Sequence, residues 1–244
     1  MIIAQNISKN FGKIEALKGI SFEIGKGEIV GFLGKNGAGK TTLMRILTSY
    51  LPPTSGKVSI AGQDIERNPL AIRRKIGYLP ENPPLYLNMT VREYLKFAAR
   101  LKDIPARETR ARIDKVLDDC RLLYVQNRTI AHLSKGYKQR IGIAQAIIHE
   151  PEVLILDEPT SGLDPVQIQQ VRKLIKDIEH KRTVLLSTHI LSEIEQIARR
   201  ILIINRGELI KDRPLEGLLK DEGAATLEEV FLKLNPPQAG RSDD

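Results

Sequence analysis

The stretch GKNGAGKTT, residues 34–42, combines three glycines with lysines and two threonines at a fixed spacing. It fits the pattern G-x-x-x-x-G-K-[ST], in which a tight loop at the start of a helix points its backbone N–H groups at phosphates. We expect Lys40 to meet the β- and γ-phosphates and the Thr41 hydroxyl to bind Mg²⁺. The residues predicted to bind the nucleotide in this phosphate loop are Gly34, Lys35, Asn36, Gly37, Ala38, Gly39, Lys40, Thr41 and Thr42. The alternative is a glycine-rich turn that only caps a helix.

Two neighbouring carboxylates follow a second chemical pattern. The apolar run VLIL ends in Asp157 and Glu158. Ligands of open parallel sheets bind at the carboxyl ends of the strands, so both side chains are expected near the phosphates. Asp157 would hold magnesium directly or through water, and Glu158 would polarise an attacking water as general base. A buried strand that merely leaves the core through an acidic turn is the structural alternative.

A second loop also has residues suited to meeting a phosphate. AHLSKGYKQR, residues 131–140, places a serine, a glycine and three cations where a helical pattern begins. Ser134 could cap that helix and direct its positive N-terminal end at an anion, although an N-cap alone would explain the serine. One chain therefore presents two loops that could each face a phosphate.

Periodicity and turn residues predict the strands and helices on which these residues lie. Strands alternate with helices, which predicts a parallel sheet, and residues 85–130 contain helical runs without a convincing strand, which predicts a helical insertion. Strands are expected at 2–8, 16–24, 28–34, 57–65 (as a pair), 75–80, 152–159 and 183–189, helices at 43–51, 164–181 and 190–200, and a hairpin at 201–210.

Composition narrows the class of protein. A chain of 244 residues can form one good-sized core, so we expect one lobe with a large appendage. The single cysteine, Cys120, excludes an internal disulfide and is expected half-buried in a helix. No run approaches the roughly 18 apolar residues of a membrane helix, and the N-terminus lacks a signal-peptide layout, so we expect a cytoplasmic protein.

The net charge of +8 is concentrated in one part of the chain. Residues 91–140 contain 13 Lys and Arg against 6 Asp and Glu, an excess of +7. Solvated helix faces, a nucleic acid or an anionic membrane surface would each account for it. Aromatic residues are only 5% of the chain and are not interleaved with these cations, so no nucleic-acid partner is expected.

In combination, these motifs resemble those of the nucleotide-binding subunit of an ATP-binding cassette (ABC) transporter, over residues 1 to about 235. LSKGYKQR stands where that family has its signature loop, commonly LSGGQ, which closes over the γ-phosphate held by a second subunit packed head to tail. The resemblance implies that Ser134 and Gly136 bind the nucleotide of the partner subunit. That explains why one chain has two phosphate-facing loops.

Further positions are matched individually by this resemblance. Phe11 in KNFGK matches the aromatic residue that stacks on adenine, although a phenylalanine in a strand would ordinarily be core. SGLD, residues 161–164, matches the loop that crosses the dimer interface, but Asp164 before Pro165 is also a good helix N-cap pair. His189 in STHILSE matches the switch histidine that contacts the γ-phosphate and the attacking water.

The sequence departs from the family pattern at three positions. Glu81 stands where the family usually has glutamine; we expect it still to reach magnesium, with altered metal dependence. Lys135 and Tyr137 replace the usual glycine and glutamine of the signature loop, which changes the surface offered to a partner. These variants and the closing TLEEVFLKL resemble ATPase subunits of bacterial multidrug and gliding-motility type exporters.

The resemblance implies an α/β fold: a P-loop NTPase core with a parallel sheet, an N-terminal antiparallel β layer and an inserted α-helical subdomain. Residues 1–84 and 146–235 would form the nucleotide-binding core, 85–145 the helical subdomain with the signature loop, and 236–244 a flexible tail. The implied activity is Mg²⁺-dependent ATP hydrolysis. Its catalytic residues would be Glu158, His189 and Lys40, and its metal-binding residues Thr41, Asp157 and Glu81.

The implied partners are a separate transmembrane permease and a second copy of the chain or a related ABC subunit. This arrangement would place the chain on the inner face of the cell membrane, driving export. The alternative is an ABC ATPase that acts on DNA or ribosomes, but such relatives usually carry a long coiled-coil insertion or a second cassette. A regulatory module with negligible hydrolysis is opposed by the intact Asp157, Glu158 and His189.

Overall fold

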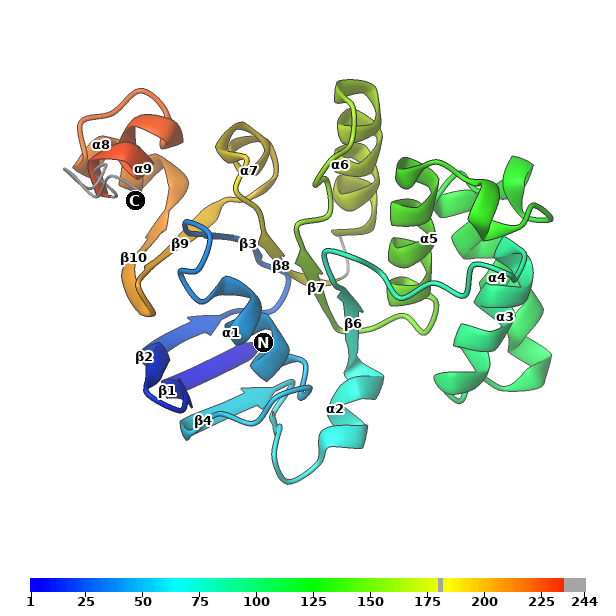
Figure 1. Cartoon of the computed structure of the whole chain (residues 1–244), viewed down its shortest axis with the longest axis horizontal. Coiled ribbons are helices and arrows are strands. Elements are labelled where there is room, and N and C mark those ends of the chain that lie inside the picture. Colours follow the sequence, from blue (N-terminus) through cyan, green and yellow to red (C-terminus); the bar gives the residue numbers. More distant parts are fainter. Residues whose placement is uncertain (180–181, 235–244) are drawn as a thin grey trace.

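Two β-sheets and the helices around them make up the molecule in our computed structural model, which describes residues 1–179 and 182–234 (Figure 1). One sheet has four antiparallel strands and the other has six strands, most of them parallel. The expected fold class, an α/β core with a parallel sheet and an N-terminal antiparallel layer, is confirmed. The expected tail, 236–244, lies outside the described residues.

The antiparallel sheet is built from the first part of the chain. Its strand order is β2-β1-β4-β5, and its bounds are β1 Ile2–Phe11, β2 Ile14–Ile24, β4 Ser55–Ile60 and β5 Gln63–Asp64. Apolar side chains of β1, β2 and β4 are buried in one cluster with α1 (Lys40–Leu47). This sheet therefore covers the helix that follows the phosphate loop.

The six-stranded sheet has the order β10-β9-β3-β8-β7-β6. Its bounds are β3 Ile29–Leu33, β6 Ile76–Leu79, β7 Val153–Asp157, β8 Thr183–Ser187, β9 Arg200–Asn205 and β10 Glu208–Pro214. Every residue of β3, β7 and β8 is buried, as expected of parallel strands covered on both faces. Strands β3, β7 and β8 end at the same edge, which carries the phosphate loop and the acidic pair.

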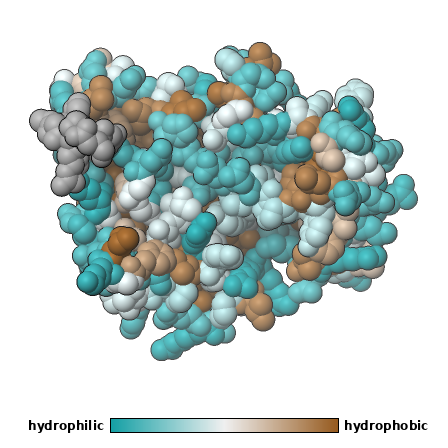
Figure 2. Space-filling view, in the orientation of Figure 1, coloured by the Kyte–Doolittle hydropathy of each residue, from teal (hydrophilic) through white to brown (hydrophobic). Residues whose placement is uncertain are grey.

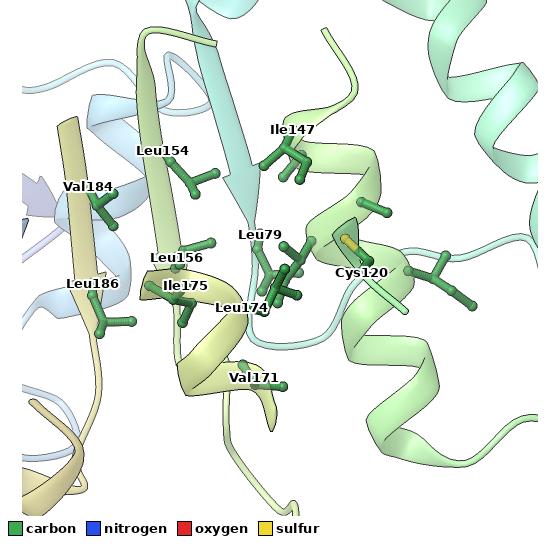
Figure 3. Packing of buried hydrophobic residues seen from close by; sticks show 14 of the residues in the cluster. Leu79, Cys120, Ile147, Leu154, Leu156, Val171, Leu174, Ile175, Val184 and Leu186 are labelled. Carbon is green, nitrogen blue, oxygen red and sulfur yellow. The ribbon is translucent and has the colours of Figure 1, made fainter. Parts of the chain in front are cut away.

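Alternate residues of these strands enter two separate hydrophobic cores. Leu154 and Leu156 of β7 pack toward α6 (Pro165–Glu179) and α5 (Lys135–Ile147), as Figure 3 shows. Val153 and Ile155 belong instead to the core shared with α1 and the antiparallel sheet. A strand with both faces in a core must read as a continuous apolar run, which is why VLIL has no alternation.

Helices α3 (Val91–Leu101), α4 (Ala106–Asp119) and α5 lie at one end of the molecule (Figure 1). Strand β10 and helices α8 (Leu215–Asp221) and α9 (Leu227–Leu234) lie at the opposite end. Within residues 85–130 the only strand-like pairing is the isolated bridge between Thr90 and Thr129, so the expectation of helices without strands is confirmed. Two short 3-10 turns, Leu123–Val125 and Ile130–His132, lead into α5.

Several local expectations were wrong. Helix α1 ends at Leu47 rather than near 51, because Ser49 takes a left-handed backbone conformation with φ 54°. Helix α7 covers only Leu191–Ile197, because Arg200 already belongs to β9. Helix α2 (Pro69–Lys75) was not predicted. Cys120 is fully buried rather than half-buried, and burial raises the pKa of its thiol.

Candidate nucleotide-binding and catalytic site

The phosphate loop connects β3 to α1 and encloses the Lys40 side chain. Gly39 has φ 109°, and a Cβ there would lie 2.8 Å from the Ala16 carbonyl oxygen, so only glycine fits. Lys40 is 7% exposed, and its Nζ donates to the carbonyl oxygens of Gly34 at 2.6 Å and Lys35 at 3.3 Å. Burial lowers the pKa of Lys40, and nearby carboxylates oppose that shift. The loop thus holds the Lys40 ammonium group against two of its own carbonyl oxygens.

A cavity of about 280 Å³ opens beside this loop. It brings together segments that are more than a hundred residues apart in sequence, since Glu81, Glu158 and His189 line it with the loop residues. From the phosphate loop it includes Lys35, Asn36, Gly37, Gly39, Lys40, Thr41 and Thr42. Ala16, which was not predicted, also lines it; no feature of the sequence had marked this residue.

Asp157 lies at the end of β7 and is 1% exposed. The Ser187 hydroxyl donates to its Oδ1 at 2.5 Å, because Asp157 and Ser187 are paired residues of β7 and β8. Burial raises the pKa of Asp157, and the charges of Glu158 and Glu81 add to that rise. The role of Ser187 was missed in the sequence; the signal was a hydroxyl at the end of the neighbouring predicted strand.

Glu158 and His189 are in direct contact. Glu158 Oε2 lies 2.7 Å from His189 Nδ1 and accepts from the His189 backbone N–H at 3.3 Å. Glu158 has φ 50°, a left-handed conformation that is uncommon outside glycine, and its N–H donates to the Ser187 carbonyl oxygen at 3.0 Å. Backbone strain of this kind is concentrated at functional sites, where the surrounding structure maintains it.

The residues present fit a magnesium ion. Burial is the main cause of the raised pKa of Asp157, but the nearby charges of Glu158 and Glu81 add to it, and a cation would relieve that repulsion. Within residues 1–179 and 182–234, no group of three or more His, Cys, Asp or Glu side chains could hold a metal ion. Magnesium does not need such a group, because it is usually held by one or two carboxylates, waters and the phosphates of its nucleotide.

Five predicted nucleotide-binding residues are not among the described residues that line this cavity. Gly34 and Ala38 belong to the phosphate loop itself, whereas Phe11, Ser134 and Gly136 lie elsewhere in the chain. Phe11 ends β1 with 48% of its surface exposed, so it is not a core residue. Ser134 is the N-cap of α5, and its side chain accepts a hydrogen bond from the Tyr137 N–H at 3.5 Å. The prediction that Ser134 caps this helix is therefore confirmed. In a single chain, the signature loop does not contribute to the site beside Lys40.

The SGLD segment, residues 161–164, leads into α6. Asp164 Oδ1 accepts from the Gln167 N–H at 2.9 Å, and Pro165 is the first residue of α6, so this part of the segment is a helix cap. The segment faces the signature loop of the same chain, because a Cβ on Gly162 would lie 2.3 Å from Lys135 Nζ.

A parallel sheet with a phosphate loop at its carboxyl edge, a buried lysine and a carboxylate paired with a histidine defines a nucleoside-triphosphate-binding ATPase of the P-loop type. Comparison with families of known proteins matches residues 17–161 to the ABC transporter family. The chain belongs to this family, as an ATP-binding subunit that hydrolyses ATP. Among the described residues, no helix is both long and apolar enough to span a bilayer.

Its relatives and similar structures agree on this family. The bacitracin transport ATP-binding protein BcrA of Bacillus licheniformis is 40% identical over 222 residues, 90% of this chain and 72% of the relative. The lantibiotic transport ATP-binding protein SrtF of Streptococcus pyogenes is 37% identical over 95% of this chain and 96% of its own. A solved ATP-binding subunit of an ABC transporter has a TM-score of 0.87 at 31% identity, covering 96% of this chain and 99% of its own. The ATP-binding cassette MJ0796, solved as a dimer in a post-hydrolysis state with ADP and Pi, has a TM-score of 0.80 at 28% identity, covering 88% and 99%.

Proposed function

We propose that the chain hydrolyses Mg²⁺-ATP in the cavity beside the phosphate loop and couples this reaction to export through a separate transmembrane permease. The observation that carries the proposal is the 2.7 Å contact between Glu158 Oε2 and His189 Nδ1 on the wall of the cavity that Lys40 also lines. The relatives named for bacitracin and lantibiotic transport support a transported compound of peptide-antibiotic type.

In this proposal each side chain has one task. Lys40 places its ammonium group against the β- and γ-phosphates, where negative charge develops during the reaction. Glu158 accepts the proton of the attacking water, and His189 fixes the orientation of the Glu158 carboxylate. Thr41, Asp157 and Glu81 would hold the magnesium ion, directly or through water. When bound, the ion neutralises charge on the phosphates.

We propose further that two copies, or this chain and a related ABC subunit, pack head to tail. Ser134 and Gly136 would then complete the partner's nucleotide site, which accounts for their position outside the cavity of their own chain. Phe11 is exposed at the end of β1 and would stack on the adenine ring. Residues 85–145 would act as the subdomain that carries the signature loop.

The first test is the solution mass of Glu158→Gln, measured by light scattering after gel filtration. With ATP and magnesium, trapped nucleotide should double the mass, and without ATP the chain should stay monomeric. ATP hydrolysis by the variant should fall by roughly a hundredfold or more, because the proton acceptor is lost. A monomer under both conditions would mean that another cassette or the permease is required, or that the signature loop does not bind a partner's nucleotide.

The permease is proposed to dock on the cleft beside α3. A cavity of about 540 Å³ reaches from Thr41 and Asp157 to Lys102 and shares Pro84, Lys102 and Gln145 with an apolar groove of about 450 Å³. Tyr86 and Leu101 line that groove and are 54% and 67% exposed. Figure 2 shows apolar side chains gathered at this helical end of the surface. Bound there, the permease would hold the chain on the inner face of the membrane.

Copurification from detergent extracts tests this docking. Tyr86→Glu with Leu101→Glu should abolish recovery of the hydrophobic membrane partner, because charge is placed in an apolar contact. The matched control is Tyr124→Glu, since Tyr124 is an aromatic residue with 98% exposure that does not line the groove. Recovery of nucleic acid instead of a membrane protein would favour the alternative class that acts on DNA or ribosomes.

A further inference from the structure

Helix α7 buries a carboxylate that the mechanism above does not use. Glu193, the third residue of α7, is only 3% exposed. Its Oε2 accepts a hydrogen bond from the Thr160 hydroxyl, and Thr160 is 2% exposed. Its Oε1 is buried without a hydrogen-bond partner among the described residues. Burying an unpaired carboxylate oxygen costs free energy, so its presence calls for an explanation.

The bond from Glu193 joins the two segments that carry the catalytic pair. Thr160 lies two residues after Glu158 on the turn that leaves β7, and Glu193 lies four residues after His189 on the segment that leaves β8. That turn closes on itself, because the Ser161 N–H donates to the Glu158 carbonyl oxygen at 3.2 Å. In Figure 1 the two segments leave neighbouring strands and enter α6 and α7.

The turn after β7 has backbone strain at Glu158, the residue proposed to accept the proton of the attacking water. Glu158 holds φ 50°, and such conformations persist only where surrounding contacts enforce them. Two contacts hold Glu158 from the β8 side, through Ser187 and His189. The hydrogen bond between Thr160 and Glu193 is a third contact between the turn after β7 and the segment after β8. Glu193 itself does not line the cavity beside Lys40.

We propose that Glu193 is a positioning residue for ATP hydrolysis. Through Thr160 it fixes the turn after β7 to α7, so that Glu158 stays aligned with His189. This inference rests on the proposed role of Glu158 as proton acceptor. It explains why a carboxylate occupies a buried site on α7 beside Ile194 and Ile197, where an apolar residue would cost less.

The test separates positioning from structural support. Glu193→Met keeps the volume and removes the acceptor, and should lower kcat roughly ten- to a hundredfold, because misalignment by a fraction of an ångström is costly in catalysis. The KM for ATP should stay near wild type, since the phosphate loop is untouched. The urea midpoint of unfolding should stay the same or rise, because a buried carboxylate with one unpartnered oxygen is lost.

Three further variants make the test specific. Glu193→Gln retains a carbonyl oxygen for Thr160 and should restore most of kcat. Thr160→Val removes the donor, should lower kcat like Glu193→Met, and should add little when the two are combined. Glu195→Gln is the control, because Glu195 lies on the same helix but accepts from Leu227 of α9, and its kcat should match wild type.

Two results would overturn the inference. One is wild-type kcat in Glu193→Met or in Thr160→Val. The other is a fall in kcat that parallels a fall in the urea midpoint, since that pattern belongs to a purely structural residue. Failure of the proposed function is recognised separately, because Glu158→Gln would then keep wild-type hydrolysis whatever the Glu193 variants do.

Discussion

Glu81 places a carboxylate where the resemblance to the ABC family implies a glutamine. It lines both the phosphate cavity and the cleft next to it, and its charge contributes to the raised pKa of Asp157. Glu81→Gln removes one negative charge from the proposed metal site, so the magnesium concentration for half-maximal ATP hydrolysis should rise several-fold. Magnesium titrations of the two proteins measure this, with Glu216→Gln of α8 as control. Identical titration curves for the wild type and Glu81→Gln would show that Glu81 does not contribute to magnesium binding.

His149 makes a prediction about pH. Burial, with help from the charge of Lys102, lowers the pKa of His149 to about 4, and its Nε2 lies 3.0 Å from the Ile76 carbonyl oxygen. The folded protein therefore keeps this ring neutral while the unfolded chain protonates near its usual pKa of about 6.5. Folding stability from this group is complete above that value and is lost as the pH falls from about 6.5 to about 4.

His149→Gln should remove this pH dependence. Over the interval from about 6.5 to about 4, the wild-type free energy of unfolding should fall by roughly 3 kcal/mol more than that of the variant. Urea unfolding at pH 7, 5.5 and 4.5 measures the difference. Parallel pH curves for the two proteins would mean that His149 accepts a proton in the folded state as readily as in the unfolded chain.

At the scale of elements, the contact between β6 and α5 positions the helical end of the molecule on the sheet. Gly77 of β6 permits it, because a Cβ there would lie 2.1 Å from the Ala146 carbonyl oxygen on α5. Gly77→Ala must push α5 away from the sheet and should lower the free energy of unfolding by about 1–3 kcal/mol, as other overpacked cores do. Displacement of α5 would also move the signature loop at its other end.

Gly217 supplies the matched control. It lies in α8 with open space where a Cβ would stand, so Gly217→Ala should raise stability by about 0.5–1 kcal/mol. Urea unfolding of Gly77→Ala and Gly217→Ala separates the cost of overpacking against α5 from the gain in stability that comes from replacing a flexible glycine. Equal changes in the free energy of unfolding for Gly77→Ala and Gly217→Ala would mean that α5 moves away from Gly77 without destabilising the protein.

At the scale of the whole molecule, Lys135 tests the proposed pairing of two chains. The residue is exposed at the start of α5, where the helix dipole is positive, and its Nζ lies over Gly162 of the SGLD segment. Lys135→Gly introduces the glycine that the resemblance implies here and removes a cation from the surface that would meet the partner's phosphates. The dissociation constant of the ATP-driven dimer should therefore rise. Light scattering in the Glu158→Gln background measures it, and an unchanged constant would contradict the role of Lys135 in pairing.

The local features of this protein could be predicted from its amino-acid sequence. The phosphate loop, the acidic pair at the end of β7 and most of the order of strands and helices were predictable, because glycine spacing, apolar runs and caps act within a few residues. Helices α2, α8 and α9 were not predicted. The cap at Asp164 and the buried run of β7 are examples. Recognition of the family rested on the same local motifs.

Contacts between residues far apart in the chain could not be predicted and were found only in the folded molecule. The sheet order sets β7 beside β8, and only this places Ser187 on Asp157 and Glu193 on Thr160. The full burial of Cys120 likewise depends on how α4 packs in the core. These contacts arise from packing between segments far apart in the chain, and no periodicity or spacing within one segment encodes them.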